Sequence, residues 1–345
     1  MKRQSVIFTQ PYRVEVHDEN LAPISEGEVR VETLVSAISP GTELLFYRGQ
    51  VPADMPVDES IAALAGVVEY PLKYGYAAVG RVVDVGRGVP EEWMEKLIFA
   101  FHPHESAFNA KPEELIRLPS GISAEQAAFL PNMETALTLV LDGAPLIGEQ
   151  VAVFGQGIVG LLTTALLARF PLASLVTLDR YAKRREASLA AGAQASLDPA
   201  AEEWRENLGR LLQADRPFEG ADLAYELSGA PAALDQAVAA TGYGGRVVIG
   251  SWYGNKRADL NLGGRFHRSR IRLISSQVST IAPELRGRWT PERRFGATWE
   301  MIRQVRPERF ITHCFPISRA TEAYRLLDEH PAETIQVMIA YQMPR

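Results

Sequence analysis

The sequence is poor in cysteine, with Cys314 alone among 345 residues. A single cysteine forms no intrachain disulfide and supplies no cysteine-rich zinc site. Long apolar runs are also lacking, because none approaches the roughly 18 residues that a membrane span requires. The N-terminal stretch MKRQSVIFTQPYRVEV has no apolar core of the kind found in signal peptides. These absences predict a soluble, cytoplasmic protein without a membrane partner.

An excess of positive charge is lacking as well. The 36 Lys and Arg residues are outnumbered by 42 Asp and Glu residues, which gives a formal net charge of −6. Binding to nucleic acid or to an anionic membrane needs a concentrated basic surface. Arginines gather only locally, at 265–272 and 286–294, and we interpret both stretches as solvent-facing. We therefore predict a small-molecule substrate and no nucleic-acid partner.

The length of the chain predicts two domains, since 345 residues are too many for one ordinary hydrophobic core. Residues 1–120 contain short alternating segments, such as 80–86, separated by glycine and proline. This pattern favours a barrel or sandwich of antiparallel strands. Beyond residue 121 the pattern changes, and residues 123–141 predict a helix with Ser123 as its N-cap.

From residue 151 onward, short apolar runs alternate with helix-forming stretches. The runs predict strands at 151–154, 174–179, 221–226, 245–250 and 271–276, and the intervening stretches predict helices at 158–169, 181–191 and 231–240. Such alternation is typical of βαβ units and of a doubly wound parallel sheet. The expected fold class is therefore α/β, with a parallel Rossmann sheet and a separate β-rich domain.

The strongest local signal is the sequence GQGIVG at 155–160. A chain with 27 glycines yields chance matches to GxGxxG, but this one follows an apolar run and opens a helix-forming stretch. In that context Gly155 permits a tight turn, Gly157 leaves room for a pyrophosphate, and Gly160 allows close packing of helix and strand. The helix N-terminus offers free N–H groups to the phosphates. The predicted dinucleotide site comprises Gly155, Gln156, Gly157, Ile158, Val159 and Gly160.

Asp179 ends the second strand of this region, 19 residues after Gly160. A carboxylate at this place can accept hydrogen bonds from both ribose hydroxyls of adenosine, and it repels a 2′-phosphate. This favours NAD over NADP. The basic residues that follow directly are Arg180, Lys183, Arg184 and Arg185. Any of them could hold a 2′-phosphate, so NADP is the alternative cofactor, with Arg180 and Arg184 as candidate ligands.

Together these features resemble the medium-chain dehydrogenase/reductase superfamily over nearly the whole chain. The stretches that carry the resemblance are SPGTELLFYRG (39–49), GYAAVGRVVDVG (75–86), VAVFGQGIVGL (151–161) and ELSGAPAAL (226–234). The resemblance implies a GroES-like catalytic domain at 1–131 and 279–345 and a Rossmann domain at 132–278. It also implies that Ser228, Gly250 and Ser251 belong to the cofactor site. The last Rossmann strand is expected to pair across a two-fold axis in a homodimer.

Within the superfamily, stretches 39–49 and 265–294 look like a zinc-lacking branch that resembles bacteriochlorophyllide a dehydrogenases and threonine-dehydrogenase-like proteins. Zinc members carry Cys-Gly-Ser/Thr-Asp where this chain has residues 40–43 (PGTE), and Gly-His-Glu where it has residues 75–77 (GYA). The third ligand position falls at Pro131. Proline and tyrosine are not useful zinc ligands, and the four-cysteine structural zinc lobe is missing. We therefore expect no zinc.

Without zinc, hydrogen-bond donors must polarise the substrate oxygen and exchange its proton. Thr42 matches the hydroxyl relay position of the family, and Tyr76 replaces the zinc-binding histidine, so its phenol is expected to face the cleft. Glu134 lies in the helix that borders the cleft in relatives and is a further candidate. Glu43 is interpreted as a structural partner of an arginine, and Tyr47 as a packing residue.

The sequence HPHE at 102–105 invites a metal interpretation, because histidines at i and i+2 of a strand share a face. No further ligand follows at a suitable spacing, however, and Pro103 disrupts strand geometry. We favour a role for His102 or His104 at the cleft, as a proton donor or substrate contact. Cys314 is interpreted as a buried, small apolar residue.

The leading hypothesis is a zinc-independent dehydrogenase that transfers a hydride between NAD(H) and a secondary alcohol or ketone. A zincless quinone or enone reductase is the first alternative, although such enzymes usually prefer NADPH. A nucleotide-binding protein without turnover, serving as a sensor, is the second. Residues 50–74 are expected to shape the pocket, and nothing in them identifies the substrate.

Overall fold

The computed structural model describes residues 1–52, 56–57, 61–212 and 219–341. The chain divides into two compact units, Met1–Pro131 with Arg306–Arg345, and Asn132–Val305. The first division coincides with the expected one at 131/132. The second lies at 305/306 rather than at 278/279, because helix α8 (Pro291–Val305) packs against α4 and buries Trp299 and Ile302.

The second unit is built on a six-stranded sheet in which every neighbouring pair is parallel. Its strand order is β10-β9-β8-β11-β12-β13. The strands are β8 (Gln150–Phe154), β9 (Ser174–Leu178), β10 (Ala195–Leu197), β11 (Ala221–Glu226), β12 (Thr241–Ile249) and β13 (Arg272–Ser275). The order runs outward from β8 in one direction and from β11 in the other, which confirms the doubly wound topology. The point of reversal lies between β8 and β11, beside the GQGIVG sequence.

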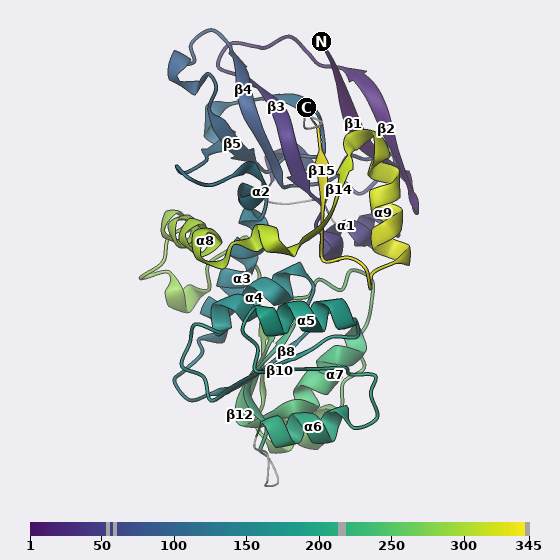
Figure 1. Cartoon of the computed structure of the whole chain (residues 1–345), viewed down its shortest axis with the longest axis vertical. Coiled ribbons are helices and arrows are strands. Elements are labelled where there is room, and N and C mark those ends of the chain that lie inside the picture. The colour runs from purple at the N-terminus through teal and green to yellow at the C-terminus, as the bar shows by residue number, and fades with distance from the viewer. Residues whose placement is uncertain (53–55, 58–60, 213–218, 342–345) are drawn as a thin grey trace. The chain divides into compact units, whose positions relative to one another are not determined.

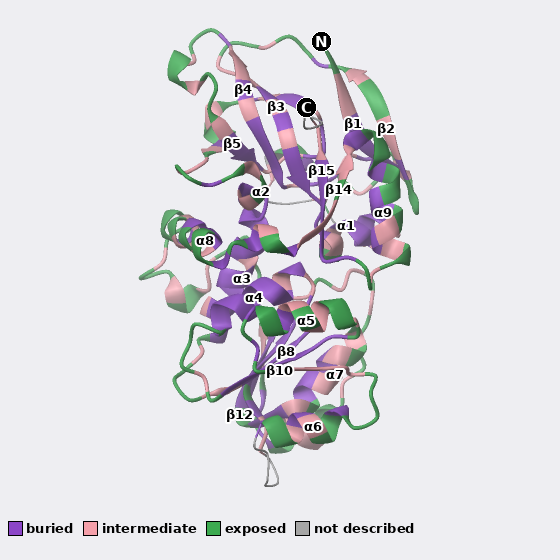
Figure 2. Ribbon diagram, viewed as in Figure 1, coloured by how far each residue is buried: buried purple, intermediate pink, exposed green. Residues whose placement is uncertain are grey.

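The helices that cover this sheet include α4 (Ile158–Leu167), α5 (Ala182–Ala190), α6 (Trp204–Leu211) and α7 (Pro231–Ala240). Trp204, Leu208 and Leu234 pack with strand residues in one hydrophobic cluster, so α6 and α7 share a face. The right-handed rule for crossover connections places α4 and α5 on the opposite face (Figure 1). Strands covered on both faces are almost wholly buried (Figure 2), which is why they appear in the sequence as continuous apolar runs.

The predicted helix at 123–141 forms as two helices, α2 (Ala124–Ala127) and α3 (Leu130–Gly143). Pro131 has no N–H to bond to the preceding turn, but it is well tolerated in the first turn of α3. Ser123 is confirmed as an N-cap, because its hydroxyl accepts a hydrogen bond from the Gln126 N–H at 3.2 Å. The short β10 and the polar α6 are additions that the apolar pattern does not predict.

The first unit is β-rich, as expected, with a seven-stranded sheet and a two-stranded hairpin. The hairpin pairs β1 (Lys2–Gln10) with β2 (Arg13–Asn20). The sheet has the order β14-β15-β3-β4-β5-β7, with β6 paired to β3. Its strands are β3 (Val29–Ala37), β4 (Ala78–Val85), β5 (Leu97–Ala100), β6 (Ala107–Ala110), β7 (Leu115–Arg117), β14 (Ile311–Pro316) and β15 (Gln336–Ala340). The C-terminal tail therefore completes the sheet of the first unit.

Helices α1 (Pro40–Tyr47) and α9 (Ala320–Glu329) pack together against the hairpin around Phe8, Phe46 and Tyr324. Helix α1 is unexpected, because Ser39-Pro40-Gly41 has the composition of a break; proline at the first helical position starts the helix instead. Single-turn helices lie at Ala62–Leu64, Glu91–Trp93, Pro112–Glu114, Pro283–Leu285, Pro307–Phe310 and Ile317–Arg319. The helical segment Leu262–Phe266 is kinked at Gly264, whose backbone is not helical.

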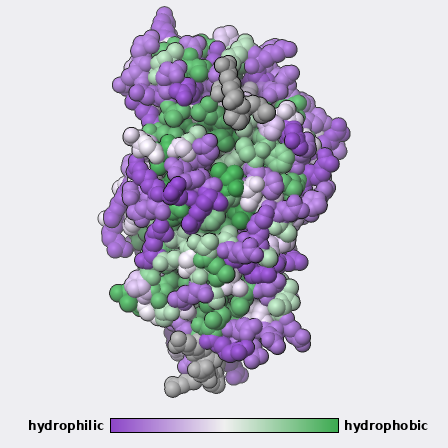
Figure 3. Space-filling model, viewed as in Figure 1, coloured by the Kyte–Doolittle hydropathy of each residue, from purple (hydrophilic) through white to green (hydrophobic). Residues whose placement is uncertain are grey.

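Two surface expectations are corrected. Cys314 is exposed rather than buried, because it lies on β14, the last strand in the sheet order. Arg294, within one of the arginine-rich stretches, is buried rather than solvent-facing. Hydrophilic and hydrophobic residues are interspersed over the face shown in Figure 3. Among the described residues, no helix has the length and apolarity needed to cross a membrane.

Candidate functional site

The turn after β8 has the geometry that its three glycines predict. Gly155 has a φ of +93°, and a Cβ there would lie 2.5 Å from the Ser228 nitrogen. Gly157 is the N-cap residue of α4, and the space beside its Cα is open. A Cβ on Gly160 would lie 2.0 Å from the Gly155 carbonyl oxygen. A tight turn, an open position and a close contact are what a pyrophosphate-binding turn requires.

The other residues of this turn divide between its interior and its backbone. The Gln156 side chain is fully buried, and its amide donates to the Gly155 carbonyl oxygen at 3.0 Å. Ile158 is buried and Val159 is half-buried in the first turn of α4. We therefore expect Gln156, Ile158 and Val159 to meet a dinucleotide through backbone N–H groups at the helix N-terminus.

Asp179 joins the end of β9 to the same turn. It is only 7% exposed, and its carboxylate accepts the backbone N–H groups of Gln156 at 2.7 Å and of Tyr181 at 2.9 Å. Each carboxylate oxygen has a second lone pair, so ribose hydroxyls can still bind. The carboxylate thus lies where an adenosine ribose is recognised in Rossmann sheets.

The basic residues after Asp179 have different surroundings. The Arg185 guanidinium donates to the Asp179 carbonyl oxygen at 2.9 Å and to the Asp198 carboxylate at 3.1 Å, which is a structural role. Arg184 lies over the Tyr181 ring, 4.9 Å from its centre. Arg180 is exposed. Because Arg185 has this structural role, Arg180 and Arg184 remain the candidate ligands for a 2′-phosphate.

Ser228, Gly250 and Ser251 lie just after the carboxyl ends of β11 and β12, at the same sheet edge. A fully buried glutamate, Glu226, organises these loops. Its carboxylate accepts the backbone N–H of Ser228 at 2.8 Å and the Ser228 hydroxyl at 2.5 Å on one oxygen, and the Tyr253 hydroxyl at 2.5 Å on the other. Sequence reasoning missed Glu226, although a carboxylate ending an apolar strand was an available signal.

In the first unit, the structure brings Thr42 and Tyr76 together. Thr42 lies in the first turn of α1, and Tyr76 lies in the segment before β4. The Tyr76 hydroxyl is 3.4 Å from the Thr42 Oγ1, whereas hydroxyl pairs usually lie about 2.7–2.8 Å apart. Both side chains are half-buried. Two hydroxyls at this separation can both donate to a single oxygen atom that lies beside them.

The residues at the zinc-ligand positions do not fit a catalytic zinc ion. Pro40 is the first residue of α1, Pro131 lies in the first turn of α3, and the Tyr76 phenol lies 3.4 Å from the Thr42 Oγ1. Zinc sites in proteins use Cys, His and carboxylate ligands. In the parts of the chain that the structure describes, no group of three or more His, Cys, Asp and Glu side chains could hold a metal ion.

Glu43 lies in a buried network, and none of its partners among the described residues is an arginine, in contrast to the expectation for this residue. One carboxylate oxygen accepts the Ser39 N–H at 2.7 Å. The other accepts the Tyr324 hydroxyl at 2.5 Å and lies 3.0 Å from the His104 Nε2. His104 is fully buried, so it cannot line a cleft. The side-chain partners of Glu43 are 61 and 281 residues away in sequence, so no local pattern signals the network. Tyr47, as expected, is a packing residue, stacked on Tyr324.

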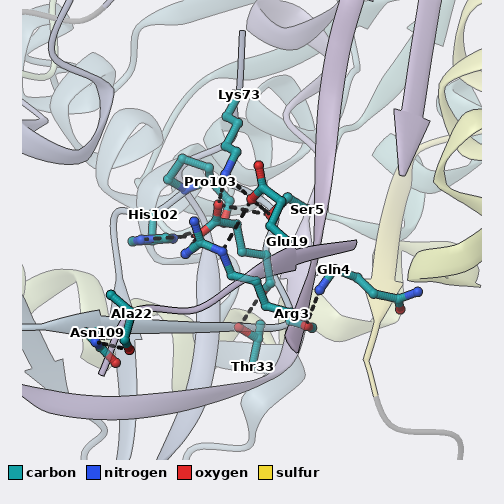
Figure 4. A network of polar contacts seen from close by, with 12 residues as sticks. Arg3, Gln4, Ser5, Glu19, Ala22, Thr33, Lys73, His102, Pro103 and Asn109 are labelled. Atoms are coloured by element: carbon teal, nitrogen blue, oxygen red, sulfur yellow. Dashed lines mark hydrogen bonds and ion pairs between the residues drawn. The ribbon is translucent and has the colours of Figure 1, made fainter. Parts of the chain in front are cut away.

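His102 belongs to a separate cluster, which Figure 4 shows with Arg3 and Lys73. Its ring stacks on Phe108 with centroids 3.8 Å apart, and burial lowers the pKa of the imidazole. The Glu105 carboxylate accepts hydrogen bonds from Arg3 and Lys73, each at 2.7 Å. These residues line an open hollow of about 580 Å³. Since the cations are paired with carboxylates, we interpret the cluster as a structural tie between β1 and the segment before β6.

Glu134 lies in α3 of the second unit and is almost fully buried. Its carboxylate pairs with the Arg294 guanidinium of α8 at 2.7 Å. Burial raises the pKa of the Glu134 carboxyl, against the opposing effect of the Arg294 cation. This ion pair gives Glu134 a structural task that competes with the predicted catalytic one, so we base the site on Thr42 and Tyr76.

Comparison with known proteins agrees with the fold. The family model described as "Zinc-binding dehydrogenase" matches residues 159–290. D-guloside 3-dehydrogenase of Escherichia coli (strain K12) is 22% identical over 333 residues, which cover 92% of this chain and 94% of the relative. (R,R)-butanediol dehydrogenase of Bacillus subtilis (strain 168) is 27% identical over 250 residues, covering 65% of this chain and 70% of the relative.

Among solved structures, a short chain alcohol dehydrogenase from Escherichia coli CFT073, complexed with the cofactor NADH, has the same fold. Its TM-score is 0.78 at 16% sequence identity, and the match covers 99% of both chains. The likeness therefore spans both units and includes the Rossmann-type and the β-rich parts.

Proposed function

The chain belongs to the medium-chain dehydrogenase/reductase superfamily, and on that premise we propose that it is a zinc-independent dehydrogenase that interconverts a secondary alcohol and its ketone with NAD(H). The family supports the broader part: the chain is an oxidoreductase that acts on small molecules with a nicotinamide cofactor. The contact between the Tyr76 and Thr42 hydroxyls is the observation that supports zinc-independent chemistry on an alcohol or ketone. By the sequence resemblance, these two residues take the positions at which zinc-dependent members hold a metal ligand and the hydroxyl relay.

The second unit supports NAD as the cofactor. The N–H groups of the 155–160 turn would hold the pyrophosphate, and the Asp179 carboxylate would accept the ribose hydroxyls while repelling a 2′-phosphate. Bound NAD supplies a nicotinamide that takes up or gives the hydride. The task left for the side chains of the first unit is to bind the substrate oxygen and to move its proton.

Thr42 and Tyr76 perform that task by hydrogen bonding. In the reducing direction, both hydroxyls donate to the carbonyl oxygen, and these bonds strengthen as negative charge develops on it. In the oxidising direction, the alcohol oxygen gives its proton to one of these hydroxyls as that hydroxyl releases its own proton to solvent, which both half-buried side chains reach. Because both side chains are half-buried, the hydrogen bonds act in a partly dehydrated environment, where they are stronger than in water.

Zinc independence is supported by the residues at the ligand positions. The family description mentions zinc, but the matched segment, 159–290, does not include Pro40, Tyr76 or Pro131. A zinc ion at these positions would have no imidazole, thiolate or carboxylate to bind. A hydroxyl-based site is the arrangement that the chain's own residues support.

The test is a cofactor titration followed by a substrate panel. NADH and NADPH binding is measured by nicotinamide fluorescence, and turnover of secondary alcohols, polyols, quinones and enones is followed by the absorbance of the reduced cofactor. We expect tighter binding of NADH and turnover of alcohols or ketones. Turnover confined to quinones or enones would replace this proposal with the reductase alternative, and binding without turnover would favour a sensor.

A further inference from the structure

The buried network around Glu43 keeps a carboxyl group away from water. The side chains of Glu43, His104, Tyr324 and Ser36 are all fully buried. A buried carboxylate is unfavourable unless hydrogen-bond donors replace the water that it loses. Glu43 has three such partners, one from the backbone and two from side chains. The network is therefore a specifically satisfied polar cluster inside an otherwise apolar core.

The hydrogen bonds that reach the Glu43 carboxylate have a defined direction. Burial and the neighbouring Glu43 raise the pKa of Tyr324 well above its usual value, so the phenol keeps its proton and donates it to the carboxylate. The His104 Nε2 must then donate as well. On the other side of the ring, the Ser36 hydroxyl lies 2.7 Å from Nδ1 and 2.8 Å from the Tyr341 hydroxyl. Burial also raises the pKa of Tyr341, so its phenol keeps its proton, and the Ser36 hydroxyl links this phenol to the imidazole.

The network connects the two segments that carry the hydroxyl pair. Glu43 holds the first turn of α1 through the Ser39 N–H, and Thr42 lies in that turn. The His104 ring packs against Gly75, the residue before Tyr76. A Cβ on Gly75 would lie only 2.6 Å from the ring, and Gly75 has a φ of +120°. One imidazole therefore bonds to the residue after Thr42 and touches the residue before Tyr76.

We propose that the Glu43–His104 couple is the positioning unit of the Thr42–Tyr76 pair, fixing the separation of the two hydroxyls. The proposal rests on the proposed function for its effect on catalysis. It assigns neither residue a contact with the substrate. Misplacing a reacting group by about 1 Å can lower a rate by about 10²-fold, so loss of the couple should lower kcat even though both hydroxyls are still present.

Two substitutions at one position separate the hydrogen bond from packing. His104→Leu removes the donor to Glu43 and keeps apolar bulk against Gly75, whereas His104→Gln can restore a donor from its amide. Asp328→Asn is the matched control, because the Asp328 carboxylate ties α9 to Arg48, after the end of α1, at 2.6 Å and lies outside the network. Each variant is assayed for kcat, KM and NADH affinity. Each is also labelled with 3-fluorotyrosine, and the Tyr76 line among the 11 tyrosines is assigned in the ¹⁹F spectrum with Tyr76→Phe.

We expect His104→Leu to lower kcat by about 10- to 100-fold, to leave NADH affinity within twofold, and to move the Tyr76 fluorine line. His104→Gln should recover part of the loss, and Asp328→Asn should behave as wild type. A folded His104→Leu protein with unchanged kcat and an unchanged Tyr76 line overturns the proposal. If His104→Leu does not fold, Glu43→Gln carries the same test. If wild type turns over no substrate, a moved Tyr76 line still supports the positioning role while the proposed function fails.

Discussion

The proposed chemistry depends most on the hydroxyl groups of Thr42 and Tyr76. Tyr76→Phe should lower kcat by about 10²-fold, or roughly 3 kcal/mol of transition-state stabilisation, because one donor to the developing negative charge is lost. NADH affinity should change little, since the cofactor residues lie in the other unit. Steady-state kinetics on the substrate found in the panel measure both quantities. Thr42→Val should act similarly, and the double variant should lose less than the product of the two single effects if the hydroxyls act as a unit. Full activity of Tyr76→Phe would remove Tyr76 from the mechanism.

We predict that Asp179 decides the cofactor preference. Asp179→Asn removes the negative charge that favours ribose hydroxyls and repels a 2′-phosphate. We expect NADH affinity to fall about tenfold, or about 1.4 kcal/mol, while NADPH affinity rises. Fluorescence titration of both cofactors gives the ratio of the two dissociation constants. Asp198→Asn is the control, because this nearby carboxylate pairs with Arg185 and lies just after β10; the ratio in this variant should remain that of wild type. An unchanged ratio in Asp179→Asn would transfer the discrimination to other residues.

At the scale of elements, the Glu134–Arg294 ion pair joins α3 to α8. Both side chains are buried, at 4% and 6% exposure, so removing one partner leaves an uncompensated charge. Glu134→Leu and Arg294→Leu should each lower the free energy of unfolding by about 3–5 kcal/mol, and the double variant by less than their sum. Urea denaturation of the four proteins completes the cycle. Strictly additive losses would show that the two residues do not stabilise each other.

The sequence predicts those elements whose cause is local. The Rossmann strands appear as apolar runs because helices cover both faces, and Ser123 marks a helix start through its own hydroxyl. The sites that escaped prediction depend on long-range contacts. His104 and Glu43 are 61 residues apart in sequence. Glu134 precedes all six strands of the second unit's sheet in the sequence, and its partner Arg294 follows them. Periodicity and spacing report on the neighbours of a residue along the chain, so they identify the fold and the glycine turn but not the partners of buried charges.

At the scale of the whole molecule, we predict that the protein holds no zinc. Purified protein should contain far less than one zinc per chain by mass spectrometry of the metal, and treatment with a chelator should leave both NADH binding and turnover unchanged. The reason is the Pro40, Tyr76 and Pro131 set, which offers no ligand of the kind that zinc binds. Stoichiometric zinc that survives mild chelation would contradict the prediction and direct attention to carboxylates and histidines elsewhere in the chain.

The last prediction concerns the open edge of the six-stranded sheet. Strand β13 ends the strand order, and an unpaired edge is a template for another strand. We expect a homodimer in which two copies of β13 pair across a two-fold axis, the commonest closed symmetry. The Ser276 N–H bonds to the Ile249 carbonyl of β12, so the N–H of the preceding residue, Ser275, points to the open edge. Ser275→Pro removes that donor without breaking the ladder to β12 and should give a 38 kDa monomer, whereas Ser275→Ala should remain a dimer. Light scattering measures both, and a wild-type mass of one chain at micromolar concentration would rule the pairing out.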